Sequence, residues 1–368
     1  MKQGTLRLLT IALIAVLVIS GSPGGADASA AAALSLGKPG TTYAYVTSYG
    51  TVEEPYTVNT NLLNHPTGLY LDETETLFVN EERGYRVVRD DSQYNPIGLT
   101  GTSFTDDYVF SSTSDMAKDS DGTLWVGDWS RVVQYDVTGV DPVFLQNFPP
   151  TDPWVTGSSN DRFDNVLGIA FDRLDKPAQH MFVSDANNQR VQVFGFDAEG
   201  KPVYINTIGE TGVSGDDQDN ARFNRPARLA VDLNNRLLVA DSLNNRVQRC
   251  ATTDDWSSWS CETFDLGGET LSYPQGISVA ANGNVLIADS NNNRVLRCTD
   301  AGACAVVVTG FPGWASDVEA KANGDLLVSD WAEMVVRRFN AQGQEQDIHK
   351  GTPGVPYTTT EGHFFSPR

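Results

Sequence analysis

A ten-residue motif recurs along this chain and constrains its fold more than any other feature. Its closest copies, which begin at an Asp, are DANNQRVQVF from Asp185, DSLNNRVQRC from Asp241 and DSNNNRVLRC from Asp289. Three weaker copies bring the total to six, spaced 41 to 57 residues apart. A period of this length indicates an array of one supersecondary unit, because a single unit of this size cannot bury its own hydrophobic faces.

Each copy follows a second shared element, in which two short apolar runs are joined by a polar turn. The fullest version is NRPARLAVDLNNRLLVAD at residues 224–241. Alternating apolar and polar residues predict strands, and the Asn, Asp and Gly between them predict turns. In the weaker copies Asn80 takes the place of the Asp, and Met334 stands where the Arg is expected.

Four predicted strands in each of six repeats indicate an all-β fold, a six-bladed β-propeller. The pattern P-x-G-[IL]…L-x-V-[AS]-D-x-x-N-N-R-V resembles the NHL-repeat family over residues 60–350. The resemblance implies four-stranded NHL-type blades around a central axis. We expect a signal peptide at residues 1–28, a flexible segment at 29–42, the propeller at 43–351 and a tail at 352–368 that resembles the start of another repeat.

The Asp and Arg of the motif are expected to pair across the turn between the second and third strands of a blade. The intervening Asn residues would supply positive φ and local hydrogen bonds. The predicted turn braces are Asp128 with Arg131, Asp185 with Arg190, Asp241 with Arg246, and Asp289 with Arg294. The alternative is a ring of binding motifs, but a binding site seldom needs the same residue from every blade.

The N-terminus has the pattern of a secretory signal peptide, with Lys2 and Arg7 before an apolar run and small residues after it. An uncleaved anchor is the alternative. Cleavage after residue 28 would make the net charge one unit more negative than −21. So acidic a surface repels phosphate backbones, and no nucleic-acid partner is expected. We expect a monomer that is secreted or periplasmic, with no membrane span after cleavage.

The four cysteines agree with export from the cytoplasm. Cys250 and Cys261 flank one predicted hairpin turn, and Cys298 and Cys304 flank the equivalent turn of the next blade. Two local disulfides are therefore predicted. A zinc site and free thiols are the alternatives.

Four tryptophans are the candidate ligand-contacting residues. Trp129 and Trp331 directly follow the anchor Asp of their repeats, whereas Trp154 and Trp314 lie in loops that lead to inner strands. All four are therefore predicted on one rim of the ring. Aromatic side chains on loops form platforms for sugars or peptides. The alternative is that they cap the core beneath longer loops.

These features favour a non-catalytic scaffold that binds an extracellular protein, peptide or glycan on the loop rim without a cofactor. The alternative is an extracellular propeller enzyme, a lyase or lactone hydrolase, with a central calcium or zinc ion. NHL-like peptide-amidating lyases hold zinc with three histidines from different blades, and only His65 stands at such a position here. A structural repeat segment of an envelope protein is a third possibility.

Ring closure requires a partner for the edge of the last blade, because an unpaired strand edge is a liability. We expect residues 43–50 to pair beside the sixth blade. The competing arrangements place residues 344–350 at that edge, or extend the chain into a longer repeat array.

Overall fold

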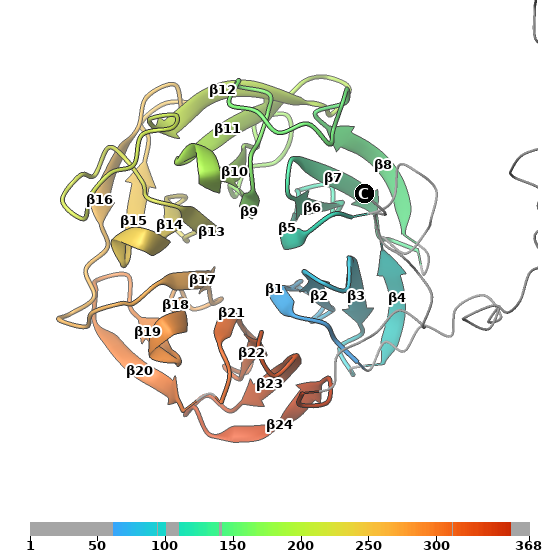
Figure 1. Cartoon of the computed structure of the whole chain (residues 1–368), viewed down its shortest axis with the longest axis vertical. Helices are drawn as coiled ribbons and strands as arrows, with labels where there is room; N and C mark the ends of the chain where they lie inside the picture. Colours follow the sequence, from blue (N-terminus) through green and yellow to red (C-terminus); the bar gives the residue numbers. More distant parts are fainter. Residues whose placement is uncertain (1–61, 94, 101–109, 140–141, 311, 355–368) are drawn as a thin grey trace, which may run out of the picture. The chain divides into compact units, whose positions relative to one another are not determined.

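The computed structural model describes residues 62–93, 95–100, 110–139, 142–310 and 312–354, which form six four-stranded antiparallel sheets in a ring (Figure 1). The predicted six-bladed propeller is confirmed. The strands of the first three blades are β1 (Pro66–Leu71), β2 (Leu77–Glu81), β3 (Arg86–Asp90), β4 (Pro96–Thr100), β5 (Thr113–Lys118), β6 (Leu124–Asp128), β7 (Arg131–Asp136), β8 (Val143–Phe148), β9 (Val166–Phe171), β10 (Met181–Asp185), β11 (Arg190–Phe196) and β12 (Pro202–Gly209). Those of the last three are β13 (Pro226–Val231), β14 (Leu237–Asp241), β15 (Arg246–Ala251), β16 (Ser260–Thr263), β17 (Pro274–Val279), β18 (Val285–Asp289), β19 (Arg294–Cys298), β20 (Cys304–Thr309), β21 (Ala315–Ala320), β22 (Leu326–Asp330), β23 (Val335–Phe339) and β24 (Glu345–Lys350).

The hydrophobic core lies between the blades, in six clusters that each join two neighbours around the ring. The second strand of a blade faces a neighbour on both sides, so all five residues of β2, β6, β10, β14, β18 and β22 are buried. This position explains why these strands are near-continuous apolar runs in the sequence.

Adjacent inner strands approach closely around the axis, which explains the Gly of the P-x-G pattern. A Cβ added to Gly276 would lie 2.5 Å from Asp317 Cα, and one added to Gly168 would lie 2.5 Å from the carbonyl oxygen of Ala227. Both distances are too short for a side chain, so glycine is required where one blade meets the next.

The Asn-rich motif forms a short 3-10 turn in blades three to five, as η1 (Ala186–Asn188), η2 (Ser242–Asn244) and η3 (Ser290–Asn292). The last Asn of the turn donates to the anchor carboxylate, at 2.8 Å between Asn292 Nδ2 and Asp289 Oδ2. The next residue takes the left-handed conformation, with φ of 47° at Asn293. Asn suits both tasks because its amide donates locally and its backbone tolerates positive φ.

The structure pairs every Asp predicted as a turn brace with its Arg. The Nε–Oδ2 distances are 2.9 Å for Arg131–Asp128, 2.8 Å for Arg190–Asp185, 2.8 Å for Arg246–Asp241 and 2.7 Å for Arg294–Asp289. The other carboxylate oxygen accepts the backbone N–H of the loop that leads to the inner strand, as Asp241 Oδ1 does from Asn224 at 2.6 Å. Each brace therefore fixes two loops at once.

The weaker first and last copies were assigned incorrectly from the sequence. In blade one the anchor is Glu81, not Asn80, and its carboxylate pairs with Arg86 at 2.5 Å. In blade six Val335 occupies the register position expected for the Arg, and Met334 takes the left-handed position with φ of 59°. Arg337 supplies the missing cation from two residues further along β23, with Nε 3.0 Å from Asp330 Oδ2.

Blade six has β24 as its outer strand, as in the competing arrangement that places residues 344–350 there. Residues 43–50 lie outside the described residues. Blades six and one are joined by side chains, because Lys350 Nζ lies 2.6 Å from both carboxylate oxygens of Asp90. Asp317 Oδ2 also accepts the backbone N–H of Leu69 at 2.8 Å.

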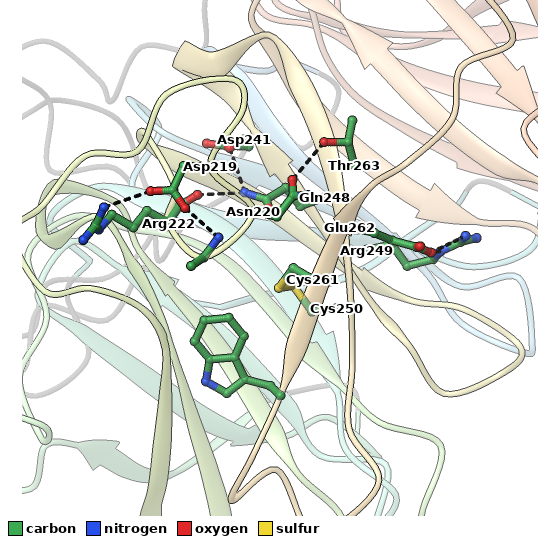
Figure 2. Close-up of a disulfide and its surroundings, with 12 residues drawn as sticks. Asp219, Asn220, Arg222, Asp241, Gln248, Arg249, Cys250, Cys261, Glu262 and Thr263 are labelled. Atoms are coloured by element: carbon green, nitrogen blue, oxygen red, sulfur yellow. Dashed lines mark hydrogen bonds and ion pairs between the residues drawn. A yellow bond between two sulfur atoms is a disulfide. The ribbon is translucent and has the colours of Figure 1, made fainter.

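Both predicted disulfides are present. Cys250 pairs with Cys261 between β15 and β16, and Cys298 pairs with Cys304 between β19 and β20. Figure 2 shows the first of these beside the Arg249–Glu262 ion pair, on the outer part of blade four. Within the described residues, no helix has the length and apolar character needed to cross a membrane.

Candidate functional site

A cavity of about 240 Å³ opens on the axis at the rim where the six inner strands begin, which we call the upper rim. Two sets of positions build it. The first is the residue before each inner strand: His65, Ser112, Asn165, Arg225, Tyr273 and Trp314. The second is the residue after each anchor acid: Glu82, Trp129, Ala186, Ser242, Ser290 and Trp331. Eight of these twelve residues line the cavity, all except His65, Ala186, Ser242 and Ser290.

Aromatic side chains form much of the wall, so we call this cavity the aromatic cup. Tyr273 and Trp314 stack at a centroid distance of 5.9 Å and an interplanar angle of 15°. Trp331 meets Trp314 edge to face at 5.7 Å and donates its Nε1–H to Glu82 at 2.9 Å. Trp129 stands on the other side, with 40% of its surface exposed. The ring contacts and the Trp331–Glu82 hydrogen bond thus fix the aromatic side chains that line the cavity.

Two hydrogen-bond donors of the cup have no partner among the described residues. Nε1 of Trp314 is one, and Nε of Arg225 is the other. Arg225 precedes Pro226 with φ of 57°, and its backbone N–H is fixed by Gln189 Oε1 at 2.6 Å. The side chain is thus anchored at its base without an ion pair at its end. Both nitrogen atoms are buried, so each carries the desolvation cost of a hydrogen bond that is not made.

An ion cluster of Asp115, Arg228 and Asp317 lies on the axis beneath the cup, and of these three residues Arg228 lines the cup. Arg228 Nε lies 3.1 Å from Asp317 Oδ2 and 3.4 Å from Asp115 Oδ1. Its Nη2 donates to the carbonyl of Ser114 at 2.5 Å. All three side chains are at most 6% exposed. The cluster ties blades two, four and six together across the centre of the ring.

Arg228 also lines a second axial cavity, of about 460 Å³, on the opposite side of the ion cluster. Its side chain therefore separates the two cavities. The second cavity is polar, and Glu319 faces it from β21. Burial raises the pKa of Glu319 well above its usual range, and the nearby charges of Asp317 and Asp115 raise it further.

The two carboxylates of the ion cluster are also perturbed. Burial raises the pKa of Asp115 to about 7, against the opposing effect of Arg228. Burial raises the pKa of Asp317 in the same direction. One guanidinium thus faces two carboxylates that are both out of water, and it offsets part of the cost of their charge.

The four predicted tryptophans do not all reach one site. Trp129, Trp314 and Trp331 line the aromatic cup, whereas Trp154 does not. Trp154 is 46% exposed and lies over Arg131, whose guanidinium carbon is 3.7 Å from the ring centroid. The structure therefore places three of the four tryptophans in the aromatic cup and Trp154 outside it.

The prediction named only tryptophans, and among the cup residues that it missed are Glu82, Arg225 and Tyr273. Their common signal is positional, because each stands directly before an inner strand or directly after an anchor acid. Aligning the repeats and reading down those two columns would have found them. Glu82 was hidden by the one-residue error in the anchor of blade one.

The described residues contain no group of three His, Cys, Asp or Glu side chains placed to hold a metal ion. His180, on the opposite rim, pairs with Asp172 at 2.6 Å. Asp115 and Asp317 are paired with Arg228. His363 lies outside the described residues.

Comparisons with known proteins agree with this architecture. The NHL-repeat family model matches residues 223–250 and 271–298, in blades four and five. A search of curated proteins finds no significant match.

Solved structures share the fold at low sequence identity. Virginiamycin B lyase from Staphylococcus aureus is 14% identical with a TM-score of 0.52, over 81% of this chain and 87% of that one. A gluconolactonase from Xanthomonas campestris is 14% identical with a TM-score of 0.51, over 74% and 84%. A protein of unknown function from Bacteroides thetaiotaomicron is 15% identical with a TM-score of 0.56, over 75% and 69%. The chain is thus a six-bladed β-propeller that carries NHL repeats at residues 223–250 and 271–298.

Proposed function

We propose that this protein is a secreted, non-catalytic binding scaffold whose ligand docks in the aromatic cup on the upper rim. The observation that supports it is the convergence of Trp129, Tyr273, Trp314 and Trp331, from blades two, five and six, on one axial cavity. Aromatic side chains contribute large contact areas at low conformational cost, and they dominate the energetics of binding sites. The ligand classes that fit such a wall are glycans, peptides and protein loops.

The fold suits binding because the Asp–Arg braces, which recur from blade to blade, support the cup. The residues that line the cup differ from blade to blade. The braces fix the loops on which the cup residues stand, so the aromatic wall is organised before any ligand arrives. A site organised in advance loses less entropy on binding. Secretion is part of this proposal, and its support is the signal-peptide pattern together with the two disulfides.

The test is binding of the purified protein to arrays of glycans and peptides, followed by titration of the hits with intrinsic tryptophan fluorescence. Trp129→Ala should weaken binding by about fivefold or more, because truncating a central aromatic contact typically costs more than about 1 kcal/mol. Trp154→Ala is the matched control, since Trp154 is exposed on the same rim but does not line the cup. Equal affinities for wild type and Trp129→Ala would refute the placement of the site.

The alternative function is a propeller enzyme, a lyase or lactone hydrolase with a central calcium or zinc ion. The observation behind this alternative is that virginiamycin B lyase and a gluconolactonase have similar folds. In this chain, however, the axial carboxylates Asp115 and Asp317 are both paired with Arg228. Elemental analysis of the purified protein separates the two functions, because stoichiometric metal would favour the enzyme.

A further inference from the structure

We infer that the aromatic cup recognises a single carboxylate-bearing sugar, a hexuronate residue at the end of a glycan, with Arg225 binding the carboxylate. This inference rests on the proposed function and adds the chemical class of its ligand. Its basis is the combination, in one cavity, of a stacked aromatic face and an arginine whose guanidinium has no partner among the described residues.

Arg225 indicates the charge of the ligand. Within the described part of the chain, its guanidinium has no carboxylate or carbonyl partner and its Nε is buried. The chain has 47 acidic and 26 basic residues, so carboxylates are plentiful. A guanidinium left unpaired in such a protein, at the wall of a cavity, has the geometry to bind an incoming carboxylate through two parallel N–H groups.

The aromatic side chains indicate the shape of the group that carries the carboxylate. Arg225, Tyr273 and Trp314 occupy the same register position in three successive blades, so the guanidinium and the stacked pair of rings line the same cavity. A pyranose ring has a flat C–H face that packs on such rings.

The rest of the wall favours a sugar over an apolar peptide side chain. Glu82, Ser112, Asn165 and Gln275 contribute carboxylate, hydroxyl and amide groups around the aromatic face. Several polar groups that surround one apolar face match the hydroxyls at the edge of a pyranose. The cavity of about 240 Å³ has room for one such ring rather than for an oligosaccharide.

The net charge of the protein limits the ligand to one acidic residue near the cup. At −21 the chain repels a polyanion, and of the two arginines that line the cup Arg228 is already paired with Asp115 and Asp317, which leaves Arg225 to attract a carboxylate. A terminal hexuronate on an otherwise neutral glycan satisfies both conditions. A polyuronate chain does not, because its remaining carboxylates would face an acidic surface.

The test uses matched monosaccharides that differ only at C6: the methyl glycosides of glucuronate and galacturonate, their methyl esters, and the neutral methyl glucoside and galactoside. Each is titrated by calorimetry and by tryptophan fluorescence. At least one of the two acids should bind about tenfold or more tightly than its ester and its neutral counterpart, because hydrogen bonds to a charged partner are the strong ones.

Arg225→Gln should abolish the preference for the acid while leaving affinity for the neutral sugar. Gln is compatible with the backbone, since Gln189 has φ of 58° before β11, close to the 57° of Arg225. Arg83→Gln is the control, because the change in net charge is the same and Arg83, whose guanidinium carbon lies 5.3 Å from the ring centroid of Trp331, does not line the cup.

The possible results separate this inference from the proposed function. Equal binding of acid, ester and neutral sugar overturns the carboxylate site and leaves the cup as a sugar site. Binding of peptides but of no monosaccharide, sensitive to Trp129→Ala, overturns the hexuronate and keeps the scaffold. If neither the sugars nor the peptide and glycan arrays bind, both proposals fail.

Discussion

Replacing Arg228 by Met tests how the centre of the ring is held together. The substitution keeps an extended side chain but removes the cation between Asp115 and Asp317. It leaves two carboxylates that are 5% and 3% exposed without a counter-charge. Removing one partner of a buried ion pair typically costs about 3–5 kcal/mol, because the remaining charge is desolvated and unpaired.

The carboxylates limit this cost by taking up a proton. For a group with an unfolded pKa of 3.8, binding a proton at pH ~7.5 costs about 5 kcal/mol, at about 1.36 kcal/mol for each pH unit. At pH ~5 the same step costs about 1.6 kcal/mol. We therefore expect Arg228→Met to lose about 4–5 kcal/mol of unfolding free energy near pH 7.5 and clearly less near pH 5.

The wild type already depends on pH in the same direction. The folded-state pKa of Asp115, about 7, lies above its unfolded value of 3.8. The folded protein thus keeps a proton that the unfolded chain releases, and stability falls as pH rises from about 4 to about 7. Arg228→Met should add at least one further retained proton, so its stability should fall more steeply, by about 1.4 kcal/mol more per pH unit.

The assay is urea unfolding followed by tryptophan fluorescence at several pH values between these limits, with the disulfides intact. Arg222→Met is the control, because Arg222 pairs with Glu210 and Asp219 on the surface and is 40% exposed. It should change stability little and leave the pH dependence unaltered. Parallel pH profiles for Arg228→Met and the wild type would contradict the reasoning, since the carboxylates would then hold their charges without the guanidinium.

Three further predictions concern stability. Replacing Cys298 and Cys304 together by Ala should lower the free energy of unfolding by about 2–3 kcal/mol, since the disulfide closes a six-residue separation in the unfolded chain; an unchanged urea midpoint would count against it. Met334→Asn should raise the thermal midpoint by relieving about 1 kcal/mol of strain at φ of 59°, whereas Met334→Val should lower it, and equal effects would show that strain is absent. Lys350→Met should lower the free energy of unfolding in urea by about 3–5 kcal/mol, because it leaves the buried carboxylate of Asp90 without a counter-charge. A loss no larger than that of Arg222→Met would refute this role of Lys350 in ring closure.

The sequence was sufficient for the blades and for the strong copies of the motif. Asp241, Arg246 and the Asn residues between them recur with the same spacing in three blades, so their pairing could be predicted from repetition alone. The disulfides followed from the same register, since both pairs flank equivalent turns.

The errors occurred where a blade solves the same physical problem with different residues. Glu81 replaces Asp one position later than the sequence alignment placed it, and its longer side chain still reaches Arg86. Arg337 reaches Asp330 from two residues further along the strand, which puts its side chain on the same face. A sequence pattern does not reveal such exchanges. The blades share the place of the charged group in space, whereas the sequence position of the residue that carries it differs.

The cup was only partly predictable for a related reason. Its members share neither residue type nor motif, and only the register brings Arg225, Tyr273 and Trp314 to equivalent places. The ion cluster beneath it was missed entirely. In the sequence, Arg228 is one polar residue in a strand of alternating polar and apolar residues. Only the closure of the ring places it between Asp115 and Asp317, which belong to two other blades.

The division between braces and cup explains how one repeat can both fold and recognise a ligand. The Asp, Arg and Asn of the motif fix the loops, so the side chains of Arg225, Tyr273 and Trp314 are not needed to fix them. Arg225, Tyr273 and Trp314 differ in chemistry although the backbone under them is the same. Exchange among these positions should therefore alter what the cup binds at little cost in stability. Alteration of an anchor such as Asp241 should unfold the loops on which the cup stands.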